Sequence, residues 1–284
     1  MIANSFEYSA PGSLKEALAL LAEGAKPLAG GMSLIPMMKL RLANPEHLVD
    51  IGRLPELNYI REEGGAIHIG AGVTHFEVES SPLLLGKCPL LAETAAYIGD
   101  IQVRNRGTLG GSVAHADPSA DYPAALHALD AKIVLTSSEG TRTLSTEEFF
   151  LDTFTTALDP GEIVSEVIVP VDAGLTGTSY QKFLQPASGF AIVGAAARVR
   201  QEGGKFTMVR VGVTGLSGNG YRARNVEDAL VGQDVTDANI KAAAALVADG
   251  QDASSDLHAT AEYRAHLAGA YTARALRAAL SRSA

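Results

Sequence analysis

The sequence predicts an α+β fold in which short strands and helices alternate first, and hairpins and longer helices follow. Three observations predict it: a capped amphipathic helix between short apolar runs near the N-terminus, Gly-Gly pairs between strand-like segments, and Ala-rich segments with helical spacing near the C-terminus. The chain has 284 residues, of which 46% are hydrophobic and 19% charged. This is enough for one large domain, or for two to three smaller ones, with a sizeable core.

The first 55 residues predict a small α/β unit. Its first helix begins at the capping-box pair Ser13 and Glu16, keeps apolar residues at i, i+3, i+4 and i+7, and ends at Gly24. The other elements expected in this unit are two short strands and a second helix, at 26–30, 46–51 and 33–42.

The middle of the chain predicts a sheet built from hairpins, with helices between them. One hairpin is expected at 59–72 about Gly64-Gly65, and another at 132–145. The other elements expected here are helices and a strand, at 75–79, 88–99, 122–131 and 162–171.

The last third predicts strands followed by helices, beyond a loop-like boundary at 170–177. Two strands are expected about Gly203-Gly204, and Ala-rich helices from residue 222 onward. The final helix has a stripe of small and aromatic residues that favours packing on its own sheet over binding a partner helix. The stripe consists of Ala268, Tyr271, Ala275 and Ala278.

Composition excludes several classes of function. The net charge is −9 and the pI is about 5.3, and no basic patch with interleaved aromatics is present, so a nucleic-acid partner is not expected. No signal peptide or stretch long enough to span a membrane is evident, which predicts a cytoplasmic protein. The single cysteine, Cys88, excludes an internal disulfide and an iron–sulfur cluster held by this chain alone, and is expected in the core.

Two glycine-rich segments are candidate anion sites, AGGMSL at 29–34 and TLGGS at 108–112. In each, a Gly-Gly turn lies beside a small hydroxyl residue, and bare N–H groups can surround an anion. A helix start after the first segment adds positive charge. Two such nests from remote parts of the chain could clamp the two halves of a pyrophosphate. Plain turns are the alternative, because the chain has 29 glycines.

Other familiar sites are missing. Neither segment has the third spaced glycine and the acidic residue of a dinucleotide fingerprint, and no G-K-[ST] loop, metal-binding His pair or Ser/His/Asp signature is present. His115, Asp117 and Asp121 could form a polar cluster, although a solvated surface group is the more common role for such residues.

Together, the strings AGGMSLIPMMKLRLANPEHLVDI and IGDIQVRNRGTLGGSVAHADPSADYPAALHALDA closely resemble the FAD-binding medium subunit of the molybdenum hydroxylases. This is the family of xanthine dehydrogenase and aerobic carbon monoxide dehydrogenase. The resemblance runs through the whole chain, from FEYSAPGSLKEALALL to YQKFLQPASGFAIVG and the segment after it. It implies that both Gly-Gly segments hold the FAD pyrophosphate.

The resemblance also implies the roles of individual residues. Asp121 matches an acidic position that binds the polar middle of the cofactor, Val164 and Lys182 match positions near the flavin, and Phe190 matches a side chain against the isoalloxazine. Met32 and Ser112 depart from the polar residue and the Asn that many relatives have there. The full set of expected cofactor-binding residues is Ala29, Gly30, Gly31, Met32, Ser33, Leu34, Thr108, Leu109, Gly110, Gly111, Ser112, His115, Asp121, Val164, Lys182 and Phe190.

The fold implied by the resemblance is α+β, with a two-part FAD-binding domain and a C-terminal α+β domain that contains an antiparallel sheet. The expected parts are an N-terminal FAD-binding subdomain, a middle FAD-binding subdomain and a medium-subunit flavoprotein domain, at 1–55, 56–173 and 174–284. FAD is the only cofactor expected in this chain. The molybdenum cofactor and the [2Fe-2S] clusters are expected in a large and a small partner subunit, in a heterotrimer that pairs into a hexamer.

The resemblance thus implies an electron-transfer subunit that passes electrons from the clusters to an external acceptor. A self-contained FAD-dependent oxidoreductase with its own substrate pocket is the first alternative. The second is a binding or scaffold protein without FAD. The substrate and the final acceptor stay open, because in this family the substrate site lies on another chain.

Overall fold

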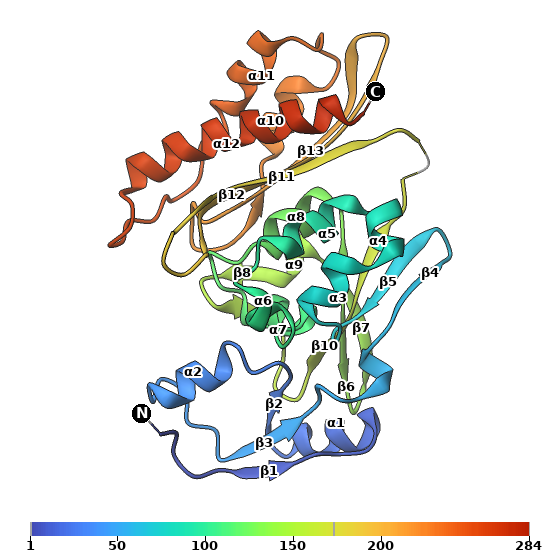
Figure 1. Cartoon of the computed structure of the whole chain (residues 1–284), viewed down its shortest axis with the longest axis vertical. Helices are drawn as coiled ribbons and strands as arrows, with labels where there is room; N and C mark the ends of the chain where they lie inside the picture. The colour runs from blue at the N-terminus through green and yellow to red at the C-terminus, as the bar shows by residue number, and fades with distance from the viewer. Residues whose placement is uncertain (1, 173, 284) are drawn as a thin grey trace.

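The computed structural model describes residues 2–172 and 174–283, and three sheets follow one another along its long axis (Figure 1). The N-terminal unit lies at one end, a middle unit in the centre, and a C-terminal sheet with its helices at the other end. The predicted α+β fold class is confirmed. The predicted boundaries at 55/56 and 173/174 stay predictions, and residue 173 lies outside the described residues.

The N-terminal unit contains a parallel sheet of three short strands in the order β1-β3-β2. Helix α1 begins as predicted, because the Ser13 hydroxyl accepts the Glu16 N–H at 3.3 Å. The capping box is only half formed, since the Glu16 carboxylate accepts the N–H of Gly12 instead of that of Ser13. The elements are β1 (Glu7–Ser9), α1 (Leu14–Ala22), β2 (Lys26–Leu28), α2 (Leu34–Lys39), β3 (His47–Asp50) and the single-turn η1 (Pro55–Leu57).

The middle unit is an antiparallel five-stranded sheet in the order β4-β5-β10-β6-β7, with helices gathered beside it (Figure 1). Both predicted hairpins and the predicted strand at 162–171 are present. The strands are β4 (Ile60–Glu63), β5 (Ala66–Gly70), β6 (Lys132–Ser137), β7 (Gly140–Ser145) and β10 (Ile163–Pro170), with a two-stranded addition of β8 (Phe150–Asp152) and β9 (Thr155–Thr156).

The helices of the middle unit are mostly short. Those predicted at 75–79, 88–99 and 122–131 are present, and Cys88 is buried in the core as expected. The helices are α3 (His75–Ser80), α4 (Pro82–Lys87), α5 (Pro89–Ala96), α6 (Ile101–Arg104), α7 (Leu109–His115), α8 (Tyr122–Ala128) and α9 (Thr146–Phe149).

The C-terminal unit is an antiparallel sheet in the order β11-β12-β13-β14, with the long helix α12 lying along it (Figure 1). Ala268 and Ala275 of α12 are fully buried, which confirms that this helix packs on its own sheet. The elements are β11 (Gly177–Leu184), β12 (Ala191–Glu202), β13 (Lys205–Thr214), β14 (Tyr221–Arg222), α10 (Arg224–Leu230), α11 (Asp237–Ala244) and α12 (Ala261–Ser281).

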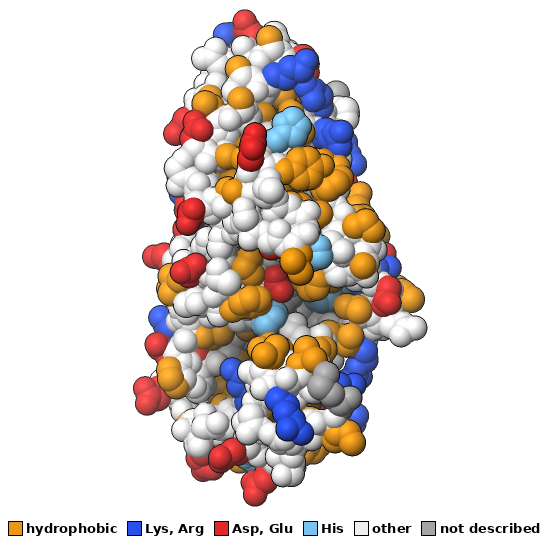
Figure 2. All heavy atoms as spheres, turned by 90° about the vertical axis from the view of Figure 1, so that its left-hand side faces the viewer, with side chains coloured by type: hydrophobic (Ala, Val, Ile, Leu, Met, Phe, Trp, Pro, Cys, Tyr) orange, Lys and Arg blue, Asp and Glu red, His pale blue; other side chains and the backbone are white. Residues whose placement is uncertain are grey.

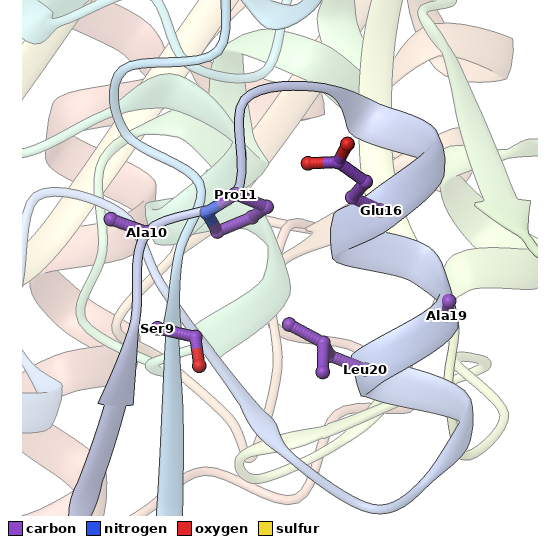
Figure 3. Close-up of a pocket in the computed structure, with 6 residues that line it drawn as sticks. All are labelled: Ser9, Ala10, Pro11, Glu16, Ala19 and Leu20. Carbon is purple, nitrogen blue, oxygen red and sulfur yellow. The ribbon is translucent and has the colours of Figure 1, made fainter.

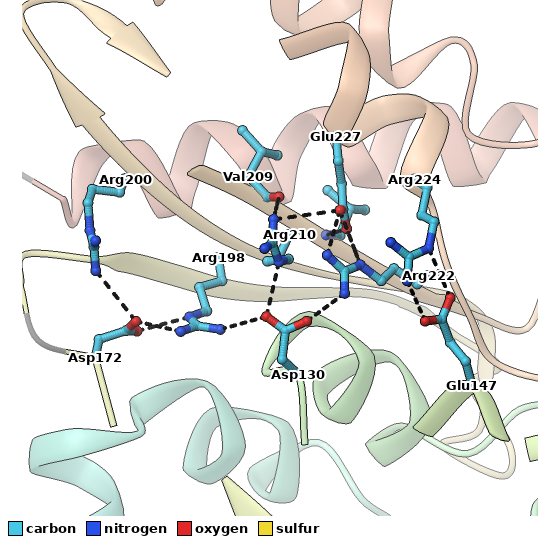
Figure 4. Close-up of polar contacts among 11 residues, drawn as sticks. Asp130, Glu147, Asp172, Arg198, Arg200, Val209, Arg210, Arg222, Arg224 and Glu227 are labelled. Atoms are coloured by element: carbon cyan, nitrogen blue, oxygen red, sulfur yellow. Dashed lines mark hydrogen bonds and ion pairs between the residues drawn. The ribbon is translucent and has the colours of Figure 1, made fainter. Parts of the chain in front are cut away.

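Helix α8 connects the middle unit to the C-terminal sheet. It packs so closely on β13 that a Cβ at Gly212 would come within 1.9 Å of the Ala124 carbonyl oxygen. Just beyond the helix, the Asp130 carboxylate accepts hydrogen bonds from Arg198, Arg210 and Arg222 (Figure 4). These contacts fix the C-terminal sheet relative to the middle unit.

Candidate cofactor-binding site

The first Gly-Gly segment leaves β2 and exposes a row of backbone donors. Gly31 has φ +74°, a conformation that suits glycine because it has no Cβ. Within the described part of the chain, the N–H groups of Gly30, Gly31, Met32 and Ser33 donate to no acceptor. Four adjacent free N–H groups on a bare glycine turn form the kind of concavity that binds phosphate oxygens.

The two glycine-rich segments meet, although more than 70 residues separate them in the sequence. A Cβ added to Gly30 would lie 1.9 Å from the carbonyl oxygen of Arg106 and 2.8 Å from the Cα of Gly107. Gly30 therefore allows the backbone that leaves β2 to lie directly against the backbone that enters α7. The sequence predicted both segments, and the structure brings them together.

The second segment differs from its prediction. Gly110 and Gly111 do not form a turn but occupy the first turn of α7, whose N-cap is Thr108. Their N–H groups are already bonded, that of Gly110 to the carbonyl of Ala71 and that of Gly111 to the Thr108 hydroxyl. Gly110 is needed for packing, because its Cβ would lie 2.3 Å from that of Ala71. What this segment offers a ligand is the exposed, side-chain-free surface at Gly111 and the partly exposed Ser112.

His75 supports this second segment and was not singled out from the sequence. The backbone N–H of His75 donates to the carbonyl of Gly107, and the ring Nδ1 lies 3.1 Å from the Tyr122 hydroxyl. Only a glycine at 107 leaves room for the ring, because a Cβ there would lie 2.6 Å from its Nε2. Burial lowers the pKa of His75 to about 4, so the ring is neutral at physiological pH. Its place at the start of a helix gave no signal of this role.

Asp121 and Lys182 are brought together in the interior. Lys182 Nζ lies 2.8 Å from Asp121 Oδ1 and donates to Oδ2 at 2.9 Å, and the Tyr180 hydroxyl donates to Oδ1 at 2.5 Å. The Lys182 side chain is fully buried and that of Asp121 is 5% exposed. Lys182 therefore faces a carboxylate rather than open space beside a ligand. Tyr180 was missed, although strand alternation places it on the same face of β11 as Lys182.

The other expected residues occupy varied surroundings. Phe190 is 48% exposed, so its ring is free to contact a planar ligand. Val164 is buried in the middle core, and its neighbour Ile163 belongs to the N-terminal core.

His115 lies against Phe154, with ring centroids 5.1 Å apart, and burial lowers the pKa of His115. His115, Asp117 and Asp121 share no hydrogen bond within the described residues, although the charge of Asp117 lies close enough to raise the pKa of both His115 and Asp121.

The face shown in Figure 2 is recessed near the middle of the molecule, with hydrophobic, histidine and acidic side chains around the recess. Beside Phe190 lies a cavity of about 210 Å³, lined also by Asp117, Ser119 and Arg264. The Arg264 guanidinium at this cavity is engaged, since it donates to the carbonyls of Ile192 and Gly215 and to Asp256.

A larger pocket, about 440 Å³, lies between the end of β1 and α1 (Figure 3). Its only ionisable group is Glu16, whose carboxylate already accepts the Gly12 N–H. Strand β1 is the edge opposite to β2, which leads into Gly30. This pocket therefore contributes nothing to the site formed by the glycine-rich segments.

Taken together, these features suit a ligand with a diphosphate and a planar ring. Free N–H groups at 30–33 can donate to phosphate oxygens, Gly111 leaves space on the facing segment, and Phe190 offers an apolar ring. The residues present therefore fit FAD. Within the described part of the chain no three His, Cys, Asp or Glu side chains could hold a metal ion, and burial raises the pKa of the Cys88 thiol to about 12.

Replacing Gly31 by alanine is expected to weaken FAD binding roughly ten-fold or more. The new Cβ would strain a backbone with φ +74° and would meet Ile35 Cδ1 at 2.6 Å, which turns the free N–H groups away from their present directions. Gly204→Ala is the matched control, because Gly204 has φ +76° and open space around it. Fluorescence titration with FAD measures both variants. Equal affinities would contradict a role for this turn in FAD binding.

Comparisons with known proteins agree with this geometry. Residues 4–172 match the family described as "FAD binding domain in molybdopterin dehydrogenase", and residues 178–279 match "CO dehydrogenase flavoprotein C-terminal domain". The chain is 42% identical to the carbon monoxide dehydrogenase medium chain of Hydrogenophaga pseudoflava over the full length of both. It is 35% identical to the glyceraldehyde dehydrogenase medium chain of Sulfolobus acidocaldarius, over 96% of this chain and 97% of that one.

A solved structure gives the same result. A chain of carbon monoxide dehydrogenase from Hydrogenophaga pseudoflava, in a form lacking the Mo-pyranopterin moiety, superposes with a TM-score of 0.97 and 44% identity, and all of both chains is covered. Two family models thus account for nearly all of the sequence, and relatives and structure match end to end. The chain belongs to the family of FAD-binding medium subunits of the molybdenum hydroxylases.

Proposed function

We propose that this chain binds FAD between its N-terminal and middle units and passes electrons from the [2Fe-2S] clusters of a small partner subunit to an external acceptor. The observation that carries the proposal is the contact between the two glycine-rich segments, with the free N–H groups of 30–33 beside it.

In this proposal the first segment, Ala29 to Leu34, holds one part of the diphosphate through backbone N–H groups. The second segment, Thr108 to Ser112, contributes a surface without a side chain at Gly111 and the hydroxyl of Ser112. Asp121 accepts a hydrogen bond from the polar middle of the cofactor, and Phe190 contacts the ring system. Bound FAD supplies the capacity to accept and release electrons. The chain itself holds, orients and shields it.

We further propose that the chain works in a heterotrimer with a large molybdenum-cofactor subunit and a small [2Fe-2S] subunit, paired into a hexamer. One buried cysteine cannot ligate a cluster, so the electron relay has to come from another chain. Among the described residues, no helix is both long and apolar enough to cross a membrane. The cytoplasmic location and the hexamer stay predictions.

The chain is expected to bind one FAD without a covalent bond. Loaded protein should be yellow, with flavin absorbance near about 450 nm, and acid precipitation should leave the flavin in the supernatant. The reason is that no cysteine is available at the site, since Cys88 lies in the middle core. Flavin that stays in the washed pellet would show a covalent link, and a colourless protein that cannot be loaded with FAD would favour the scaffold alternative.

The isolated, FAD-loaded chain is not expected to oxidise an organic substrate. In the described part of the chain no three His, Cys, Asp or Glu side chains could hold a metal ion, and the one cysteine is buried, so neither a metal centre nor a cluster is available to oxidise such a substrate. The assay offers purines, aldehydes, N-heterocycles and carbon monoxide with an artificial dye as acceptor. Turnover of about 1 per second or more would instead identify a self-contained flavoenzyme. Reduction of the flavin by a chemical reductant serves as the positive control.

A further inference from the structure

We propose that Tyr180 and Lys182 are positioning residues, which act on FAD through Asp121 and not by touching the cofactor. They hold the Asp121 carboxylate charged and in one orientation, so that it can accept a hydrogen bond from a hydroxyl or N–H of FAD. This inference rests on the proposed binding of FAD between the N-terminal and middle units.

The geometry around Asp121 assigns these roles. Its Oδ1 accepts the Tyr180 hydroxyl at 2.5 Å, and its two oxygens lie 2.8 and 2.9 Å from Lys182 Nζ. The Lys182 ammonium also donates to the carbonyl of Tyr97 at 3.0 Å. With these acceptors engaged and its side chain fully buried, Lys182 has no surface from which to contact a ligand. Asp121 keeps 5% of its side-chain surface and unused acceptor capacity.

The fold makes room for Tyr180 in particular. Tyr180 and Gly194 lie on adjacent antiparallel strands, and a Cβ at Gly194 would come within 2.3 Å of the Tyr180 hydroxyl. The absence of a side chain at 194 therefore leaves the hydroxyl where it meets Asp121. The Tyr97 ring packs edge-on against the Tyr180 ring, with centroids 5.7 Å apart, and fixes its direction.

The loop before Asp121 is also fastened to the C-terminal unit, next to Phe190. The carbonyl oxygens of Pro118 and Ala120 lie 2.9 and 2.7 Å from the Thr214 hydroxyl and share its one proton, and the Ala191 N–H donates to the carbonyl of Ser119. Asp121 and the exposed ring of Phe190 are thus held by one short stretch of backbone. A shift of the Asp121 carboxylate would therefore also move the backbone next to Phe190, where the ring system of FAD is proposed to lie.

The charges around Asp121 make its protonation depend on Lys182. The pKa of Asp121 is raised above its usual value, mainly by burial and in part by the nearby Asp117, and the charge and hydrogen bond of Lys182 and the hydroxyl of Tyr180 offset part of this rise. Burial raises the pKa of both Tyr122 and Tyr180, so neither of these hydroxyls supplies a charge to replace that of Lys182. Removing Lys182 must raise the pKa further, so the carboxyl would take up a proton as the pH falls.

The test is the pH dependence of FAD binding in Lys182→Met, in the full-length chain. Wild type is expected to change its Kd less than about three-fold between pH 9 and pH 6. Lys182→Met is expected to lose affinity for FAD at least about ten-fold over the same range, because a proton taken up by Asp121 then competes with FAD binding.

Asp121→Asn should bind FAD weakly and with the same Kd at all pH values. The double variant Lys182→Met/Asp121→Asn should have the Kd of Asp121→Asn. Lys205→Met, in an exposed ion pair, is the control with a flat profile.

A purely structural role of Lys182 predicts a different result. Lys182→Met would then lose the same affinity for FAD at every pH, and the double variant would bind FAD more weakly than Asp121→Asn. That outcome would overturn the proposal. Tyr180→Phe gives a second, milder test if Lys182→Met does not fold. It should weaken FAD binding roughly three- to ten-fold, which is less than the full value of one hydrogen bond to a charged group because Tyr180 acts only through Asp121, and it should have no effect in the Asp121→Asn background. An equal effect in both backgrounds also overturns the proposal. Failure of wild type to bind FAD at all would instead refute the proposed function.

Discussion

Replacing Gly30 by alanine is expected to lower the affinity for FAD at least about 100-fold, equivalent to about 2.7 kcal/mol. Gly30 does not have a positive φ, so the cost arises from contact and not from backbone strain. The new Cβ would lie 1.9 Å from the Arg106 carbonyl oxygen, whereas real contacts of this kind essentially never fall below 3.0 Å. The two backbones must move apart by more than 1 Å, and the proposed diphosphate site depends on their distance. Fluorescence titration with FAD measures the loss.

Gly86→Ala is the control for this prediction, because Gly86 lies in a helix and a Cβ there would have nothing within 4 Å. It should leave FAD binding unchanged and should raise stability by up to about 1 kcal/mol through helix propensity. Gly30→Ala should keep the far-ultraviolet circular dichroism of wild type, since the contact involves one short junction. Normal FAD affinity in a folded Gly30→Ala protein would show that the junction of the two segments is not where the diphosphate binds.

Much of the architecture could be predicted, because local patterns determine it. The helix 13–24 and the hairpins about Gly64-Gly65 and Gly203-Gly204 follow from capping, hydrophobic spacing and turn chemistry within a few residues. The elements that were missed are short, such as β1, α4 and α6, and contain too few residues for a periodic signal.

The second Gly-Gly segment shows why local reasoning fails at the site. Two glycines predict a turn, since glycine is a poor helix former, yet here they form the first turn of α7. The reason is tertiary: Gly110 lies against Ala71, and Gly111 is bonded to the Thr108 cap. The pairing of Asp121 with Lys182, 61 residues apart, likewise depends on how α8 meets the C-terminal sheet. No spacing in a single sequence encodes such a contact.

Helix α8 connects the site to the stability of the whole chain. Asp121 at its start is bound by Lys182 and Tyr180 of β11, and Asp130 beyond its end is bound by arginines of β12, β13 and β14. Between them, His127 donates its Nε2–H to the carbonyl of Gly220 and accepts the Thr146 hydroxyl at Nδ1. Burial lowers the pKa of His127 to about 4, so this ring bridges the units in its neutral form.

The arginine cluster around Asp130 is tightly interconnected. Arg222 Nη1 lies 2.5 Å from Asp130 Oδ1, and Arg210 Nε and Arg198 Nη1 lie 3.0 and 3.4 Å from Oδ2 (Figure 4). Arg222 also pairs with Glu227, and Arg198 with Asp172. Asp130 is therefore an acceptor common to these three guanidinium groups, and its charge joins the end of α8 to the C-terminal sheet.

Replacing Asp130 by asparagine is expected to destabilise the chain by about 2 kcal/mol or more. Asparagine keeps the size of the side chain and tolerates φ +52°, so only the charge is lost. Three guanidinium groups would then lose a shared counter-ion, and breaking a buried pair costs about 3–5 kcal/mol, reduced here because Asp130 is 36% exposed. Thermal and urea unfolding measure the loss. Asp237→Asn, in exposed pairs with Lys241 and Arg277, should cost less than about 0.5 kcal/mol. Equal losses in the two variants would mean that the cluster at Asp130 does not hold the units together.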